Sequence, residues 1–331
     1  MGETAQSGSE ELVLGFLAEA GDEFVSGEAI SDKLGLSRAA VWKHVNALRG
    51  QGYRIDALPA RGYRLVEIPD RLTPLELRPL LATHDLGQVL HCFEEVGSTN
   101  DVAKQLAEEG AAHGEAVIAE RQTAGRGRRG RAWDSPAGKN LYLSVVLRPD
   151  LPPQRAPELT LVASVALCDV VRQAGVEAGI KWPNDLLARG RKLAGILTEL
   201  AAEPDTVQWV VLGMGVNLNV RAEDFPDDLR EQATSLAIER GQPAPRALFT
   251  AALLARLEEW LDRHAAEGFG PVREAWRERS ATLGREVRVE VEGREVTGVA
   301  EDLDETGALL VRCGKRLERV TSGDVQLLRA R

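Results

Sequence analysis

Hydrophobic positions in the first fifth of the chain recur at helical spacing and then alternate. Residues 11–20 have the apolar face of an amphipathic helix. Ser26 is suited to cap a short second helix, and Gly35 to make the turn after it. Ser37 then caps a third helix with an apolar stripe of its own. This succession predicts a helix-turn-helix over residues 10–68.

A β-hairpin wing is expected directly after the third helix. Residues 53–55 and 62–65 read as its two strands, on either side of the turn 58–61. The outward face of the third helix carries side chains suited to bases and phosphates in a major groove. They are Arg38, Ala39, Trp42, Lys43, Asn46 and Arg49. We therefore interpret the segment as a DNA-binding winged helix; a winged helix that docks only on protein is the alternative.

The centre of the chain alternates short apolar runs with longer amphipathic segments. The runs that read as strands are 89–94, 116–121, 141–147, 179–182, 194–200 and 209–218. The expected helices are 100–109, 156–173, 246–264 and 272–279. Strands outnumber helices up to residue 219, and several follow one another directly. The pattern therefore predicts a mixed sheet in an α+β domain rather than a doubly wound fold.

The tail from residue 283 alternates with the two-residue period of strands. These strands are expected at 287–291, 294–299, 309–312 and 320–328, separated by glycine-containing turns. Their number and length are typical of a small SH3-like β-barrel. The predicted organisation is therefore α+β, with a winged helix-turn-helix domain over 1–68, a central mixed-sheet domain over 69–280 and an SH3-like domain over 281–331.

Charge narrows the possible partners. The chain has a formal net charge of −10, which argues against a general nucleic-acid binder and restricts DNA contact to a local patch. Cys92, Cys168 and Cys313 lie far apart, without metal-ligand or disulfide spacing, which fits a reducing cytoplasm. Residues 1–10 lack the features of a signal peptide, and the apolar runs are too short to span a bilayer. We expect a cytoplasmic protein.

Against this acidic background, residues 125–131 hold four arginines and three glycines in seven positions. Guanidinium groups suit phosphate and carboxylate, and glycine lets a backbone approach a ligand closely. The run alone is also compatible with an unstructured RNA-binding arm. Because predicted strands precede and follow it, we interpret it as a lid over an anionic ligand. Its glycines and mutually repelling arginines predict a mobile loop when the site is empty.

Polar clusters at two strand ends carry further chemistry. Asn184 and Asp185 offer the hard oxygen ligands that Mg²⁺ prefers, although Asn-Asp is also a common turn. Lys192 begins the next strand, where its ammonium either meets a phosphate or lies at a solvated hairpin tip. Gly213 and Gly215 inside a strand suggest close approach by a ligand.

A fourth cluster, Ser98 to Asn100, either caps a helix or receives a polar head group. The sequence shows no serine–histidine–acid set and no histidine spacing typical of a metal site. The chain thus lacks an obvious nucleophile, which fits chemistry in which the carboxylate of the substrate attacks a nucleotide phosphate. For this reaction the protein needs only to position the reactants and to neutralise charge.

These clusters, in this order behind a winged helix, resemble those of bifunctional biotin–protein ligases that also repress the biotin operon. The resemblance covers about residues 10–329 and is most specific at 125–131, 181–185 and 191–196. It implies a class II synthetase-like ligase domain. There the carboxylate of biotin attacks the α-phosphate of ATP, giving biotinyl-5′-AMP and pyrophosphate. A lysine of the biotin carboxyl carrier protein of acetyl-CoA carboxylase then takes the biotinyl group.

The same resemblance implies roles for individual residues. Lys192, Arg126 and Arg128 would be catalytic, and Asn184 and Asp185 would hold Mg²⁺. Biotin would be bound by Ser98, Thr99, Asn100, Gln122, Gly125, Arg126, Gly127, Arg128 and Lys192. The nucleotide would be bound by Arg128, Arg129, Arg131, Trp133, Asn184, Lys192 and Asn217. The residues facing operator DNA would be Ser37, Arg38, Ala39, Trp42 and Lys43, with biotinyl-5′-AMP as corepressor of a homodimer.

Three other functions are compatible with parts of the pattern. A lipoate or octanoate ligase shares this kind of catalytic domain, but the arginine-rich run and the winged helix favour biotin. A ligand-sensing repressor with an inactive ligase half is disfavoured by Lys192 and the loop arginines. A ligase without a repressor role remains open, because the regulatory half rests on residues 10–68 alone.

Overall fold

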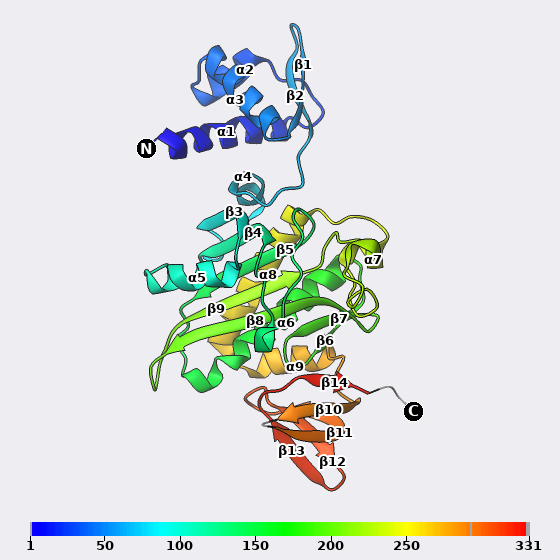
Figure 1. The fold of residues 1–331 in the computed structure, drawn as a ribbon. Helices are drawn as coiled ribbons and strands as arrows, with labels where there is room; N and C mark the ends of the chain where they lie inside the picture. Colours follow the sequence, from blue (N-terminus) through cyan, green and yellow to red (C-terminus); the bar gives the residue numbers. More distant parts are fainter. Residues whose placement is uncertain (1, 292, 329–331) are drawn as a thin grey trace. The chain divides into compact units, whose positions relative to one another are not determined.

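The computed structural model describes residues 2–291 and 293–328 (Figure 1). The chain divides into two compact units, and the division falls between Arg71 and Leu72 in the sequence. The predicted boundaries at 68/69 and 280/281 remain proposals. In the described ranges, no helix has the length and apolar character needed to cross a membrane.

The first unit is a winged helix-turn-helix, as predicted. It comprises α1 (Gly2–Glu19), α2 (Gly27–Leu34), α3 (Arg38–Gly50), β1 (Arg54–Leu58) and β2 (Gly62–Glu67). The hydroxyl of Ser26 accepts the N–H of Ala29 at 3.0 Å, and that of Ser37 accepts the N–H of Ala40 at 3.1 Å. Both predicted caps are therefore confirmed. α1 begins well before residue 11, so the predicted start of that helix is wrong.

The second unit is built on a mixed seven-stranded sheet in the order β3-β4-β5-β9-β8-β7-β6. Its strands are β3 (Leu90–Val96), β4 (Ala116–Gln122), β5 (Leu141–Leu147), β6 (Ala178–Lys181), β7 (Asp185–Ala188), β8 (Arg191–Ala202) and β9 (Val207–Val216). Only the β3–β4 pair is parallel among the described pairs. The sequence prediction missed β7, because its four residues are framed by turn-forming Asn184 and Gly190.

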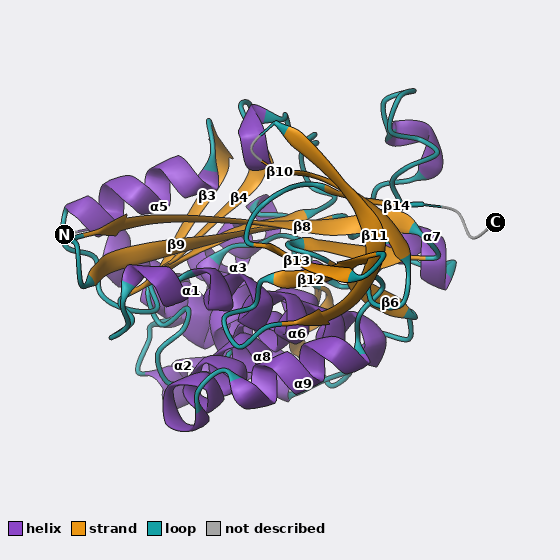
Figure 2. Ribbon diagram, turned by 90° about the horizontal axis from the view of Figure 1, so that it is seen from below, coloured by secondary structure: helices purple, strands orange, loops and turns teal. Residues whose placement is uncertain are grey.

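Helices cover both faces of this sheet (Figure 2). They are α4 (Pro74–Leu77), α5 (Thr99–Glu108), α6 (Pro157–Gln173), α7 (Leu236–Arg240), α8 (Arg246–Glu267) and α9 (Gly270–Glu278). One face packs on α6, α8 and α9 through the main apolar core, while α5 closes a smaller core on the other face. The first turn of α5 thereby reaches the strand ends that form the site.

The C-terminal part is an antiparallel five-stranded sheet in the order β13-β12-β11-β10-β14, consistent with the SH3-like fold expected. The strands are β10 (Glu286–Val291), β11 (Arg294–Leu303), β12 (Leu309–Cys313), β13 (Arg316–Val320) and β14 (Val325–Leu327). The single strand expected over 320–328 is wrong. β13 ends at Val320, and the four residues 321–324 carry the chain to β14 at the other edge of the sheet.

Candidate active site

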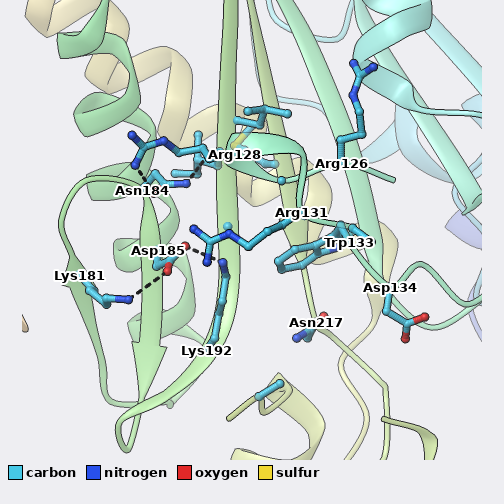
Figure 3. Close-up of a pocket in the computed structure, with 18 of the residues that line it drawn as sticks. Arg126, Arg128, Arg131, Trp133, Asp134, Lys181, Asn184, Asp185, Lys192 and Asn217 are labelled. Carbon is cyan, nitrogen blue, oxygen red and sulfur yellow. Dashed lines mark hydrogen bonds and ion pairs between the residues drawn. The ribbon is translucent and has the colours of Figure 1, made fainter. Parts of the chain in front are cut away.

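A cavity of about 690 Å³ lies between the start of α5, the arginine-rich loop, strands β8 and β9, and strand β14 (Figure 3). It brings together most of the ligand residues predicted from the sequence. They are Ser98, Thr99, Asn100, Gln122, Arg126, Gly127, Arg128, Arg131, Trp133, Asn184, Asp185, Lys192 and Asn217. Gly125 and Arg129 are outside the lining. One cavity therefore joins clusters that lie far apart in sequence.

The arginine-rich loop is folded as a narrow hairpin. The N–H of Gly127 donates to the carbonyl of Arg131 at 2.7 Å, and that of Trp133 donates to the carbonyl of Gly125 at 2.9 Å. A Cβ at Gly125 would lie 2.6 Å from the carbonyl oxygen of Trp133. Glycine at position 125 is thus required for packing within the loop, which differs from the ligand contact expected of it.

Each loop arginine meets a counter-charge. Arg126 pairs with Asp101 at 2.6 Å, while Arg131 pairs with Asp324 of the C-terminal sheet. Arg128 and Arg129 each lie 3.9 Å from the same Asp324 carboxylate. The mutual repulsion expected of these arginines is therefore offset, because carboxylates from two other elements face them. Mobility of the empty loop stays a prediction.

Burial and charge set the protonation properties of these groups. Burial is the largest influence on Arg128 and lowers its pKa, against the raising effect of Asp324. For Asp101, burial raises the pKa, but hydrogen bonds from Lys104 and Arg126 outweigh it and the pKa is lowered. The pKa of Glu199 is lowered in the same way, by hydrogen bonds from Asn100 and Lys104 that outweigh its burial. Asp101 and Glu199 therefore stay ionised and hold the guanidinium of Arg126.

Trp133 lies over the glycines of the sheet. A Cβ at Gly215 would come within 2.6 Å of its indole ring, and one at Gly195 within 3.2 Å. The ammonium of Lys192 sits 5.3 Å from the ring centroid. At Gly213 the space is taken by the side chain of Asn100. Protein side chains thus occupy the space that a Cβ would take at Gly213 and Gly215, while both glycines line the cavity, and close approach by a ligand stays a prediction.

Two lysines of the cavity, Lys181 and Lys192, both lie close to the carboxylate of Asp185. Asp185 accepts an ion pair from Lys192 at 2.7 Å and one from Lys181 at 3.5 Å (Figure 3). Asn184 donates to the carbonyl of Ile196 at 2.7 Å, and its Oδ1 accepts from Arg128 at 3.3 Å. Across residues 2–291 and 293–328 there is no group of three or more His, Cys, Asp or Glu able to hold a metal. Asp185 is the carboxylate of the 181–185 cluster, so Mg²⁺ held there would need phosphate oxygens and water among its other ligands.

The opposite end of the cavity is lined by the first turn of α5. The N–H of Thr99 donates to Gln122 Oε1 at 2.9 Å, and Gln122 Nε2 donates to Ser135 at 3.1 Å. Asn100 donates to Glu199 at 2.8 Å and accepts from Ser144 at 2.7 Å. Both ends of the Asn100 side-chain amide therefore bind protein groups. These hydrogen bonds hold the start of α5 against the sheet.

Some lining residues gave no sequence signal. Phe225, Leu229 and Gln232 come from the segment after β9, where the carbonyl of Gln232 accepts the N–H of Lys192 at 2.7 Å. Asp324 to Leu327 come from the C-terminal sheet. These residues form no local motif, and only the folding of distant segments onto the sheet brings them to the site.

Models of known protein families match the chain in three segments: the winged helix, the central domain and the C-terminal sheet. A model described as HTH domain matches residues 10–64. One for the Biotin/lipoate A/B protein ligase family matches 92–217, and one for the Biotin protein ligase C terminal domain matches 282–328. The Bifunctional ligase/repressor BirA of Bacillus subtilis (strain 168) is 39% identical, over 94% of this chain and 96% of its own. The Bifunctional ligase/repressor BirA of Escherichia coli (strain K12) is 34% identical, over 93% of this chain and 94% of its own.

The chain belongs to the BirA family of bifunctional ligase/repressors.

Solved structures agree with this membership. The biotin protein ligase from Aquifex aeolicus in complex with biotin and ATP has a TM-score of 0.64 and 28% identity, covering 73% of this chain and all of the other. Among relatives compared by sequence, the Biotin--[acetyl-CoA-carboxylase] ligase of Mycobacterium tuberculosis (strain ATCC 25618 / H37Rv) is 40% identical, over 72% of this chain and 89% of its own.

The winged helix of this BirA family member presents the predicted DNA-facing residues on α3. Ser37, Arg38, Ala39, Trp42 and Lys43 are all exposed. Trp42 stands out, since 61% of it is accessible although an indole usually packs. Arg38 forms an ion pair with Glu28 at 2.7 Å, which a phosphate can replace.

Proposed function

We propose that this chain is a biotin–protein ligase that activates biotin with ATP and transfers it to a lysine of the biotin carboxyl carrier protein of acetyl-CoA carboxylase. The supporting observation is the convergence of Lys192, Arg128 and Trp133 on one cavity. An ammonium, a guanidinium and an indole suit the carboxylate, phosphate and adenine of an acyl-adenylate. Family membership supports the same reaction.

In the first step, a carboxylate oxygen of biotin attacks the α-phosphate of ATP, and the bond to pyrophosphate breaks. Lys192 and Arg128 neutralise the negative charge that builds up between the two anions. Asp185, together with the phosphates, would hold Mg²⁺, and the ion would supply further charge neutralisation. Ser98, Thr99 and Gln122 orient biotin, and Asn217 faces the nucleotide. Gln122 keeps its place through Thr99 and Ser135.

In the second step, the amine of the carrier lysine attacks the carbonyl carbon of biotinyl-5′-AMP, and AMP leaves. The loop 125–131 excludes water in the interval, so that the mixed anhydride is not hydrolysed. Its four arginines compensate the phosphate charge while the loop covers it.

ATP–pyrophosphate exchange tests the ligase proposal. Biotin should drive the exchange, whereas lipoate and octanoate should not. Lys192→Ala should abolish the exchange and the biotinylation of the carrier protein, while the thermal midpoint Tm stays within a few degrees because Lys192 is partly exposed. Exchange driven by lipoate, or carrier biotinylation that survives the substitution, would contradict the assignment.

We also propose that the biotinyl-5′-AMP complex dimerises and binds the operator of the biotin genes through α3 and the wing. The exposed cationic face of α3 in a chain of net charge −10 supports a local DNA contact. A gel shift on the chain's own biotin-gene promoter, with and without biotin and ATP, tests it. No adenylate-dependent shift would leave a ligase without a repressor role. The proposed location is the cytoplasm, where the free Cys92, Cys168 and Cys313 remain reduced.

A further inference from the structure

A chain of buried polar groups begins at the first residue of the second unit. The N–H of Leu72 donates to Glu120 Oε1 at 2.8 Å. Glu120 also accepts from Arg246, the first residue of α8, at 2.7 Å. Arg246 is only 1% exposed. A buried arginine of this kind is tolerated only when its donors are matched, so the pair is a rigid anchor.

The anchor continues to Asn140, just before β5. Arg246 donates to the carbonyl of Asn140 at 3.2 Å. The side chain of Asn140, itself 1% exposed, accepts the N–H of Leu218 through Oδ1 at 3.0 Å. Because a backbone N–H can only donate, Oδ1 must face Leu218 and Nδ2 must face the other way.

The Nδ2 atom of Asn140 faces the end of the cavity that the proposed function assigns to the nucleotide. Asn140 Nδ2 donates to Tyr142 Oη at 3.2 Å and reaches Asn217 Oδ1 at 3.5 Å. Asn217 in turn donates from Nδ2 to the carbonyl of Thr234 at 3.1 Å. Both ends of the Asn217 amide are thus determined by protein partners. One N–H and one lone pair of that amide remain for a ligand in the cavity that it lines.

We propose that Asn140 is a positioning residue for the nucleotide, which acts by setting the amide orientation of Asn217. The Arg246–Glu120 pair holds the backbone of Asn140 in place behind it. The inference rests on the proposed ligase function, in which Asn217 faces the nucleotide. It extends the site to three buried residues that contact no substrate.

The test is Asn140→Asp, which keeps the shape of the side chain and removes the donor to Asn217. Loss of one directed hydrogen bond should raise KM for ATP about tenfold in biotin-dependent ATP–pyrophosphate exchange. KM for biotin should stay within about twofold, because biotin binds at the α5 end of the cavity. Asn140→Ser removes the same donor without adding charge and should raise KM for ATP in the same direction.

Asn219→Asp is the matched control. Asn219 lies two residues beyond Asn217 and exchanges hydrogen bonds with Ala244 at 2.8 and 2.9 Å, but it lies outside the cavity lining. Its substitution removes a comparable donor and should leave both KM values unchanged. An unchanged KM for ATP in both Asn140 variants, or equal loss of both substrates in step with a lowered Tm, would overturn the inference. If the wild-type chain shows no biotin-dependent exchange, the ligase proposal itself fails instead.

Discussion

At the scale of single residues, the site depends on glycines that make room for one tryptophan. Gly195 and Gly215 belong to neighbouring strands, and the indole of Trp133 lies against both. The ammonium of Lys192 lies 5.3 Å from the ring centroid, and the Lys192 side chain, like the indole, lies against Gly195. A methyl group at either glycine would therefore be felt in the ligand pocket.

Gly215→Ala should displace Trp133, because its new Cβ would sit 2.6 Å from the ring. We expect binding of the nucleotide to weaken about tenfold, the equivalent of about 1.4 kcal/mol, measured by calorimetric titration with a non-hydrolysable ATP analogue. Gly270→Ala is the control, since a Cβ there meets nothing within 4 Å. Unchanged nucleotide affinity in Gly215→Ala would show that the position of Trp133 does not matter for binding.

At the scale of elements, the loop 125–131 and the C-terminal sheet form one electrostatic unit. Asp324 faces three of the loop arginines, and the carbonyl of Gly323 accepts from Arg128 at 3.2 Å. A small β-domain that looks like an appendage in sequence thereby supplies one wall of the cavity and the counter-charge of the lid.

Asp324→Asn should loosen the loop, because the three guanidinium groups lose their shared carboxylate. The expected result is severalfold faster trypsin cleavage after the loop arginines in the ligand-free protein, with protection restored by biotin and ATP. Glu290→Gln is the control: this exposed residue lies 3.9 Å from Arg129 only. Equal cleavage rates for Asp324→Asn and the wild type would argue against the role of Asp324.

Helices α6 and α8 are joined by a buried acid that makes stability depend on pH. Burial raises the pKa of Glu158, but hydrogen bonds from His264 and Arg155 outweigh it, so the folded pKa is lowered. A lowered folded pKa adds stability above the unfolded value of about 4.3 and loses it as pH falls through the folded pKa.

Glu158→Gln should therefore lower the free energy of unfolding at pH 7 and flatten its decline below about pH 4.3. Urea titrations at a series of pH values measure both effects. Glu259→Gln removes an exposed acid on α8 and should change neither, because surface ion pairs contribute little. An acid limb as steep in Glu158→Gln as in the wild type would contradict the assignment.

At the scale of the whole molecule, two proposed sites for anionic partners share one acidic chain. The net charge of −10 opposes DNA, so binding has to come from the exposed face of α3. The residues proposed for the ligase reaction belong to the second unit, which begins at Leu72 in the sequence.

Lys43→Ala should weaken operator binding by the adenylate-bound protein and reduce the slope of log K against log salt by about 0.9, the value of one phosphate contact. Carrier biotinylation should be unchanged. Lys315→Ala, on the exposed surface of the C-terminal sheet, is the control and should leave the slope intact. An unaltered slope in Lys43→Ala would remove Lys43 from the DNA contact.

The local pattern of apolar and polar residues was sufficient to predict most of the helices and strands. Capping by Ser26 and Ser37, the mixed sheet and the β-rich tail all followed from spacing, because hydrogen bonds within a turn or helix depend on near neighbours. The misses were local as well: β7 is too short to show a period, and the break between β13 and β14 is only the four residues 321–324.

The sequence by itself determined the order of the domains and the residue types of the site, from the arginine-rich loop to Lys192. Only the tertiary structure decided how those residues are used. It placed Trp133 against Gly215, Asp324 among the loop arginines and Asn140 behind Asn217. The physical reason is that charge compensation and close packing act through space between segments with no fixed separation along the chain. No periodicity records such contacts.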